Sequence, residues 1–263
     1  MTTRQARNAH RSVLPSAKHQ PKGLRYTSAV LFGRPGIGKT YWMTTFKRAL
    51  AIDLEGGTRM MEATAVEPRS WEELIGVLDA LEMEDHKFDT VSIDTVDRAF
   101  AMCDQAVCRD LGVPTVGDAA HGKGWSMLKS RWSSFVYRVI NLKTADGRKL
   151  LPFFLAHEKL IPMTERRNGT PVDTGRSLVT VNLPNTGKVI LLSAVDFVFH
   201  LHLDENEQRF IRTQAVDTAE FRIEAKGRGA PGRSLPAVIP AEFGALVRAF
   251  NDTFNMKEND DVR

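Results

Sequence analysis

The order of apolar and polar segments predicts strands that alternate with helices from residue 27 onward. Short apolar runs with the length of buried strands lie at Ser28–Phe32, Ala49–Asp53, Thr90–Ile93 and Leu151–Ala156. Helices are expected at Lys39–Arg48, after the capping box Ser70-Trp71-Glu72-Glu73, from the end of the third strand to about Leu111, and along the apolar stripe from Trp125 to Val139. Strands separated by helices imply parallel crossovers. The predicted fold is therefore α/β, with a mostly parallel sheet flanked by helices on both faces.

The pattern changes after Ala156. A polar stretch from Lys159 to about Lys188 is predicted to be a long loop. Further strands are expected around Phe197–Leu203, Phe210–Thr213 and Glu220–Ala225, and a helix near Ala241–Phe250. We expect these strands to extend the sheet in antiparallel fashion, so that residues 27–253 form one domain.

The two ends of the chain differ from this domain. Residues 1–26 carry six arginines and lysines, no acidic residue and few apolar side chains, so we expect a disordered basic arm. It could be a solvated tail, or it could contact phosphates of a nucleic acid. Residues 254–263 are polar and are expected to form a flexible tail.

Composition and charge indicate which partners and which cellular compartment to expect for the protein. The net charge of +4 hints at a polyanionic partner. The two cysteines, Cys103 and Cys108, form no disulfide framework, which fits a reducing compartment. Because no apolar run is long enough to cross a membrane, we expect a cytoplasmic protein without membrane contacts. The arginine-rich, acid-free start leaves an organellar transit peptide open.

The strongest motif is a phosphate-binding loop. Residues 33–40 read GRPGIGKT and fit the pattern G-x-x-x-x-G-K-[ST] between a predicted strand and a predicted helix. Glycines let backbone N–H groups point at phosphate oxygens, and the following helix adds its positive end. The pattern predicts ATP and Mg²⁺ as cofactors, with Lys39 on the β- and γ-phosphates and Thr40 on the metal. Candidate nucleotide-binding residues are Gly33, Arg34, Pro35, Gly36, Ile37, Gly38, Lys39, Thr40 and Tyr41.

Carboxylates at the ends of two further strands complete the predicted site. Residues 88–94 read FDTVSID, a buried strand ending in Asp94, as in a Walker B element that holds Mg²⁺. Hydrolysis needs a base, which AAA+ motors place directly after that aspartate, but here the position is Thr95. Glu55, after the second strand, is the alternative base if it projects from the same sheet edge as Lys39.

These motifs, in this order, resemble the RecA-type recombinase core. The similarity rests on Ile-Asp-x-Glu at residues 52–55, Ile-Asp-Thr at residues 93–95, a glycine-containing loop before a long helix, and a strand ending in a polar residue. It covers about residues 27–240 and is greatest for short phage ATPases, the Sak-type single-strand annealing proteins. The resemblance implies an ATPase stimulated by single-stranded DNA, which oligomerises as a ring or filament and promotes annealing or strand exchange. It also implies roles for Glu55 as catalytic base and for Asp94 as Walker B acid.

The resemblance suggests three more site residues. His157 falls where recombinases carry a polar residue that senses the γ-phosphate, although it could be an ordinary hydrogen-bonded histidine at a strand end. Lys226 and Arg228 lie where related filaments reach the γ-phosphate of a neighbouring subunit, and a solvated loop is the alternative.

Two segments correspond in order to the DNA-binding loops of such proteins. They are residues 112–125, which include Lys123, and residues 160–188, which include Arg166, Arg167 and Arg176. Arginine and lysine side chains on mobile backbone can bind DNA phosphates independently of the base sequence. Both segments are expected beside the nucleotide edge of the sheet. Trp125, the only aromatic residue among them, is predicted to belong to the core, because it continues an apolar stripe.

The sequence thus predicts a phage or prophage ATPase, in a bacterial cytoplasm, that acts on single-stranded DNA, with a single-strand-binding protein as a candidate partner. Two alternatives stay open. One is an AAA+ or helicase-type motor or loader, against which Thr95 stands. The other is a nucleotide-dependent DNA-binding module that hardly hydrolyses ATP.

Overall fold

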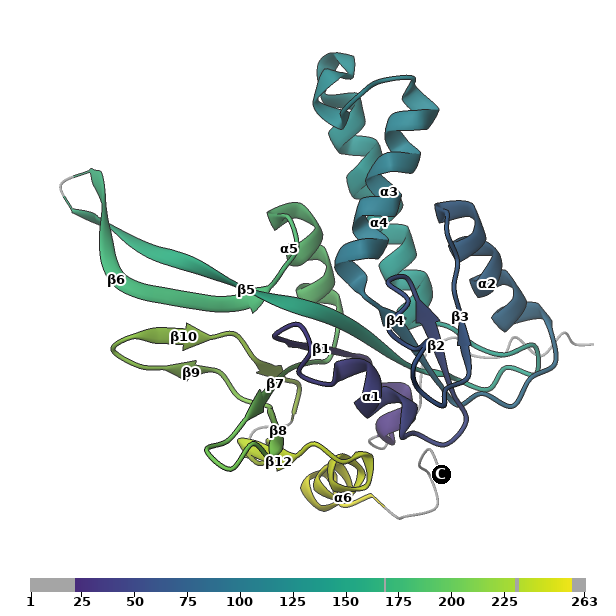
Figure 1. Cartoon of the computed structure of the whole chain (residues 1–263), viewed down its shortest axis with the longest axis vertical. Coiled ribbons are helices and arrows are strands. Elements are labelled where there is room, and N and C mark those ends of the chain that lie inside the picture. Colours follow the sequence, from purple (N-terminus) through teal and green to yellow (C-terminus); the bar gives the residue numbers. More distant parts are fainter. Residues whose placement is uncertain (1–21, 168, 230–231, 257–263) are drawn as a thin grey trace, which may run out of the picture.

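The computed structural model describes residues 22–167, 169–229 and 232–256 (Figure 1). Most of the predicted basic arm and of the predicted tail lies outside these residues. Within them, Leu24–Tyr26 forms a 3₁₀ turn (η1) with Leu24 buried. Arg25 pairs with the buried carboxylate of Asp89 at 3.1 Å. Residues 24–26 therefore belong to the folded domain, and their assignment to a disordered arm was wrong.

A mostly parallel sheet forms the centre of the molecule, as predicted. Its strand order is β12-β8-β7-β1-β5-β4-β2-β3, and neighbouring strands from β7 to β3 run parallel. The strands are β1 (Ala29–Gly33), β2 (Ala49–Asp53), β3 (Ala65–Val66), β4 (Thr90–Asp94), β5 (Leu151–Arg167), β7 (Phe197–Leu203), β8 (Arg209–Arg212) and β12 (Val238–Pro240).

The sheet differs from expectation in its antiparallel part. Within the eight-strand order given above, β7 runs parallel to β1, so the antiparallel part of that order begins only at β8 and continues with β12. Strand β2 is not a direct neighbour of β1, since β5 and β4 lie between them.

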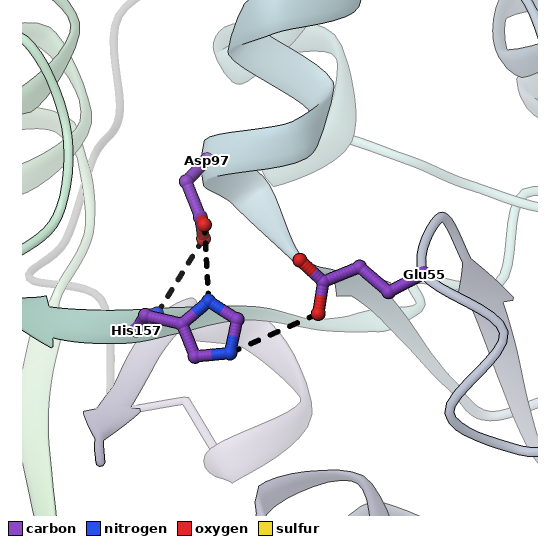
Figure 2. Close-up of side chains that lie close together, drawn as sticks. All are labelled: Glu55, Asp97 and His157. Atoms are coloured by element: carbon purple, nitrogen blue, oxygen red, sulfur yellow. Dashed lines mark hydrogen bonds and ion pairs between the residues drawn. The ribbon is translucent and has the colours of Figure 1, made fainter. Parts of the chain in front are cut away.

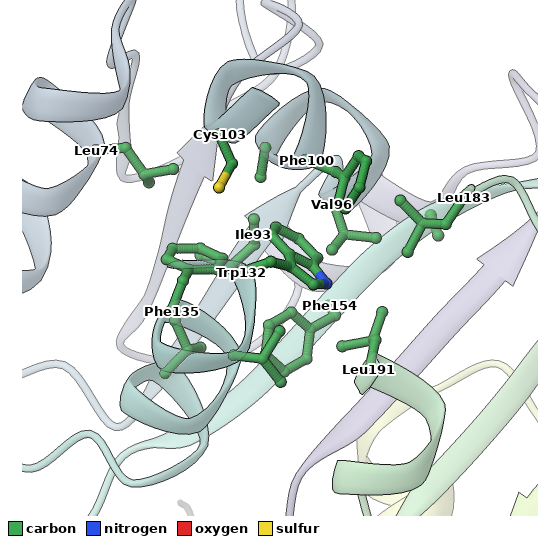
Figure 3. Close-up of a cluster of buried hydrophobic side chains, with 14 of the residues drawn as sticks. Leu74, Ile93, Val96, Phe100, Cys103, Trp132, Phe135, Phe154, Leu183 and Leu191 are labelled. Atoms are coloured by element: carbon green, nitrogen blue, oxygen red, sulfur yellow. The ribbon is translucent and has the colours of Figure 1, made fainter. Parts of the chain in front are cut away.

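Helices cover both faces of the sheet because residues alternate between the faces along each strand. Val30 and Phe32 of β1 pack with one set of helices, α2 (Trp71–Met83), α3 (Val96–Leu111), α4 (Lys123–Ile140) and α5 (Asn185–Ala194). Figure 3 shows part of this cluster, in which Trp132 lies beside Ile93 and Phe154. Ala29 and Leu31 pack on the other face with α1 (Lys39–Thr44) and α6 (Phe243–Phe254). Helix α1 ends four residues earlier than predicted, at Thr44. None of the helices in the described part of the chain has both the length and the apolar character needed to cross a membrane.

Helices α3 and α4 project together from the sheet (Figure 1). The short turns η2 (Val116–Asp118) and η3 (Ala120–Gly122) join them at the far tip. Because the 16 residues of α3 span about 24 Å, residues 112–125 lie away from the nucleotide edge, contrary to expectation. The core placement of Trp125 was also wrong, since this side chain at the start of α4 is 55% exposed.

The polar stretch after Ala156 is a β-hairpin arm and not the loop that we predicted. Strand β5 continues to Arg167 and pairs antiparallel with β6 (Thr170–Val181), and the two extend from the body of the molecule (Figure 1). Near the base of this arm, β6 pairs with β10 (Phe221–Ile223), which in turn pairs with β9 (Val216–Asp217). A short strand β11 (Lys226–Gly227) pairs with β7.

Candidate functional site: the carboxyl edge of the sheet

The phosphate-binding loop connects β1 to α1 with the lysine turned into the loop. Nζ of Lys39 donates to the carbonyl oxygens of Gly33 and Arg34, at 3.0 Å each. The side chain is 5% exposed, and burial lowers its pKa. The buried ammonium group of Lys39 is hydrogen-bonded to neutral carbonyl groups of the loop, so an anionic ligand bound beside it would supply the opposite charge.

Glycine is required at two positions of this loop for different reasons. A Cβ on Gly33 would lie 2.7 Å from the carbonyl oxygen of Leu201, because β7 passes directly beside the end of β1. Gly38 has φ of +101°, a left-handed conformation that only glycine adopts without strain, and it directly precedes Lys39 at the start of α1. The two glycines let the loop turn tightly between strand and helix.

Thr40 and Asp94 meet at the same edge. The Thr40 hydroxyl donates to Oδ2 of Asp94 at 2.5 Å, which brings together the two oxygen groups predicted to bind Mg²⁺. Burial raises the pKa of Asp94 to about 6, against the opposing hydrogen bond from Thr40. A buried carboxylate whose charged form is disfavoured fits a site for a divalent cation, which would supply the missing positive charge.

Glu55 lies at this edge as well, as the sequence predicted. Asp53 and Asp94 are paired neighbours at the ends of β2 and β4, and Glu55 follows Asp53 by two residues. The Asp53 carboxylate accepts backbone hydrogen bonds from residues 55–58 at 2.7–3.2 Å, and so holds the Glu55 loop in a tight turn. Burial alone would raise the pKa of Asp53, but the hydrogen bonds donated by Thr58, Glu55 and Gly56 hold it below its usual value.

The Glu55 side chain is positioned by groups from two other elements. Oε1 accepts a hydrogen bond from the Thr95 hydroxyl at 2.9 Å. Oε2 lies 3.8 Å from Nε2 of His157, whose other ring nitrogen contacts Oδ2 of Asp97 at 3.0 Å (Figure 2). His157 pairs with Gly33 across β5 and β1, which places it beside the phosphate-binding loop. The structure thus brings Lys39, Thr40, Asp94, Glu55 and His157 to one edge.

A comparison with protein families matches residues 25–228 to the family described as AAA domain. The chain belongs to this family of P-loop ATPases. The match spans the sheet from η1 to β11 and includes each element of the site described above. Thr95 after Asp94 therefore does not exclude an AAA-type ATPase, although the sequence pattern alone counted this residue against one. A search of curated proteins finds no match to the chain.

A pocket of about 640 Å³ adjoins helix α1 of this AAA domain, one residue beyond Thr40. Tyr41, which is 57% exposed, lines the pocket together with Gln208, which precedes β8, and Pro240 of β12. Arg209 also lines it, and its Nε donates to the carbonyl oxygen of Ile37 at 2.7 Å, linking this pocket to the phosphate-binding loop.

Lys226 and Arg228 do not lie at the nucleotide edge of their own subunit. They follow β10, and β11 pairs with the start of β7, opposite the edge formed by its end. Nζ of Lys226 donates to the carbonyl oxygens of Leu192 and Val195 at 2.8 and 2.6 Å, and so caps the end of α5. Arg228 pairs with Asp196 at 3.0 Å. A contact with a neighbouring subunit stays a prediction, but Lys226 already has a structural role.

The lysine cap gives a testable expectation. Replacing Lys226 with methionine should lower the free energy of unfolding by about 1–2 kcal/mol, because the α5 carbonyls lose a charged donor. ATP hydrolysis should stay within about twofold of the wild-type rate, since the side chain is remote from the loop. Urea denaturation and a steady-state ATPase assay on the same preparation measure both. Loss of hydrolysis at unchanged stability would instead support the trans-acting role.

Sequence reasoning assigned no site role to four residues that the structure places here. Asp53 and Thr95 were noted only as parts of motifs, and Asp97 resembled an ordinary acidic residue in the first turn of a helix. Arg209 lies 172 residues from its loop contact, and no local pattern indicates such a contact. A signal did exist for Asp53, since an aspartate at the start of a glycine-containing turn can accept hydrogen bonds from the backbone two residues on.

Proposed function

We propose that this AAA domain binds Mg²⁺–ATP at the carboxyl edge of its sheet and hydrolyses it, with Glu55 as the base. The observation that carries the proposal is the convergence of Lys39 and Thr40 with the carboxylates of Asp94 and Glu55. Direct contacts support it too, since the Thr40 hydroxyl donates to Asp94 and Glu55 follows the end of β2, the strand beside β4.

Each residue then has a definite task. Backbone N–H groups of residues 33–40 hold the phosphates, and Lys39 exchanges its loop carbonyls for β- and γ-phosphate oxygens. Thr40 and Asp94 would hold Mg²⁺, which neutralises charge on the phosphates when bound. Glu55 accepts a hydrogen bond from the attacking water. The water oxygen bonds to the γ-phosphorus as the bond to ADP breaks, and the water proton passes to Glu55 and then to solvent.

The pocket beside α1 suits the adenine base, which gives a second expectation. Tyr41→Ala should weaken ATP binding about 5–10-fold, because stacking of an aromatic side chain on a base contributes about 1–3 kcal/mol and this ring is half exposed. Tyr137→Ala is the matched control, since Tyr137 is 52% exposed on α4 and lies outside the pocket. Fluorescence titration with an ATP analogue measures both variants. If the two variants bind the ATP analogue with equal affinity, the adenine base does not bind in this pocket.

We further propose that the protein is a RecA-like ATPase of the Sak type that acts on single-stranded DNA as a homo-oligomer in phage-type recombination. The resemblance of residues 27–240 to that core supports this role. So does the β5–β6 arm, which begins beside His157 at the nucleotide edge and extends about 33 Å beyond it. The arm presents the exposed cation Arg166. Because the arm continues the strand that carries His157, a movement of that strand on ATP binding or hydrolysis would also move the arm and any DNA bound to it.

The test is ATP hydrolysis with and without single-stranded DNA, across a salt series. Stimulation that declines as salt rises would support contacts to DNA phosphates. Hydrolysis that DNA never stimulates would refute the DNA role and leave the ATPase proposal standing. Nucleotide-dependent DNA binding with negligible hydrolysis would favour the switch-like DNA-binding module instead.

A further inference from the structure

Asp97 holds His157 by two contacts. Asp97 lies in the first turn of α3, three residues after Asp94, and its side chain is 18% exposed. Its Oδ2 lies 3.0 Å from Nδ1 of His157, and its Oδ1 accepts from the backbone N–H of His157 at 3.4 Å. An ionised carboxylate can only accept hydrogen bonds, so this contact places the proton of the neutral ring on Nδ1. Nε2 is then left as an acceptor.

That acceptor faces the carboxylate of Glu55. Figure 2 shows the His157 ring between the two acidic side chains, with Nε2 directed at Glu55. The Nε2–Oε2 separation of 3.8 Å is too long for a direct hydrogen bond. Two acceptors at this spacing leave room for one water molecule that donates a hydrogen to each. The oxygen lone pairs of such a water point away from both groups.

We propose that Asp97 is a positioning residue for hydrolysis, which fixes the tautomer of His157 so that His157 and Glu55 together orient the attacking water. The inference rests on the proposed ATPase function and deepens it. Glu55 alone accepts one hydrogen of the water and leaves it free to rotate. A second acceptor at Nε2 removes that freedom, which is the role that orientation plays in catalysis.

The same three groups could in principle bind a metal ion, since one ligand atom of each lies within 4.8 Å of the others. The structure favours the hydrogen-bonded arrangement for two reasons. Nδ1 of His157 is already engaged by Asp97. Oε1 of Glu55 is engaged by Thr95. These contacts hold the ring and the carboxylate in place without an ion.

The decisive variant is Asp97→Asn, which keeps the shape of the side chain. Its amide can donate to Nδ1 and so move the ring proton to Nε2, which removes the second acceptor. We expect kcat to fall about 10–100-fold. The affinity for a non-hydrolysable ATP analogue should stay within about threefold, because Asp97 has no place among the phosphate ligands. Asp104→Asn on the same helix is the matched control, and its kcat should not change.

Nitrogen NMR of the His157 ring gives a readout that does not need activity. At a pH where the ring is neutral, the wild-type protein should carry the proton on Nδ1 and Asp97→Asn should carry it on Nε2. His157→Ala should lose kcat to the same extent as Asp97→Asn, and the double variant should be no worse than either single variant by more than about threefold.

Several results would overturn the inference. The first is a wild-type His157 ring protonated on Nε2, and the second is a wild-type kcat in Asp97→Asn. The third is a double variant in which the losses of the two single variants multiply. The fourth is a loss of nucleotide affinity in Asp97→Asn as large as its loss of kcat, which would show that Asp97 acts through the charge of Lys39. If Glu55→Gln keeps full activity, Glu55 is not the base, and this inference fails with that part of the proposed function. If only Glu55→Gln is inactive, the proposed function stands and Asp97 has no positioning role.

Discussion

Glu55→Gln is expected to lower kcat for ATP hydrolysis about 10²–10⁴-fold, the usual contribution of a general base. The amide keeps the size of the side chain and can still accept from Thr95, so the turn held by Asp53 should persist. Affinity for Mg²⁺–ATP should change by less than about threefold, because Glu55 acts on the water and not on the phosphates. Steady-state hydrolysis and titration with a non-hydrolysable analogue separate the two effects.

The matched control for this variant is Glu67→Gln. Glu67 lies in the segment that follows the same loop and pairs with Arg59 at 2.8 Å. Its side chain is only partly buried and its partner is exposed, so its loss should leave hydrolysis unchanged. If Glu55→Gln hydrolyses ATP at the wild-type rate, Glu55 is not the base. If the wild-type protein itself barely hydrolyses ATP and Glu55→Gln alters nothing, the protein is a nucleotide-dependent binding module.

Trp132→Ala is expected to lower the free energy of unfolding by about 3–5 kcal/mol, a large part of the 5–15 kcal/mol typical of a domain. Trp132 is fully buried between α3 and α5, with its ring 5.0 Å from that of Phe100. Its Nε1 donates to the carbonyl oxygen of Gly187 at 3.1 Å. The substitution leaves a cavity in the cluster of Figure 3 and removes this hydrogen bond.

Chemical denaturation of Trp132→Ala and of Tyr137→Ala, on the same helix, measures this effect. Tyr137 is 52% exposed, and its removal should change stability by less than about 0.5 kcal/mol. Equal losses in the two variants would mean that α4 does not pack against α3 and α5 as the structure shows.

The features that the sequence predicted correctly rest on local signals. The phosphate-binding loop is one continuous motif, and the capping box is local too, with Ser70 Oγ accepting from the Glu73 backbone at 3.1 Å. Apolar runs predicted β2 and β4 closely, because buried parallel strands need continuous apolar residues. The shared edge of Asp94 and Glu55 follows from that, since parallel strands end on the same side.

The features that were missed depend on contacts between distant segments. Asp97 acquires its partner only when β5 inserts beside β4 and brings His157 to the first turn of α3. Polar residues are frequent along the β5–β6 arm, so the pattern suggested a loop, although Asn168-Gly169 is a strong hairpin signal. Trp125 continues the helical stripe of α4 but lies beyond the sheet that would cover it, since the α3–α4 pair projects past the core.

The most direct test is a crystal structure of the protein with Mg²⁺ and a non-hydrolysable ATP analogue. We predict that the triphosphate lies over residues 33–40, that Thr40 and Asp94 hold the metal, and that Glu55 faces the γ-phosphate. A triphosphate bound elsewhere, or a Glu55 carboxylate turned away from the γ-phosphate, would contradict the proposed site.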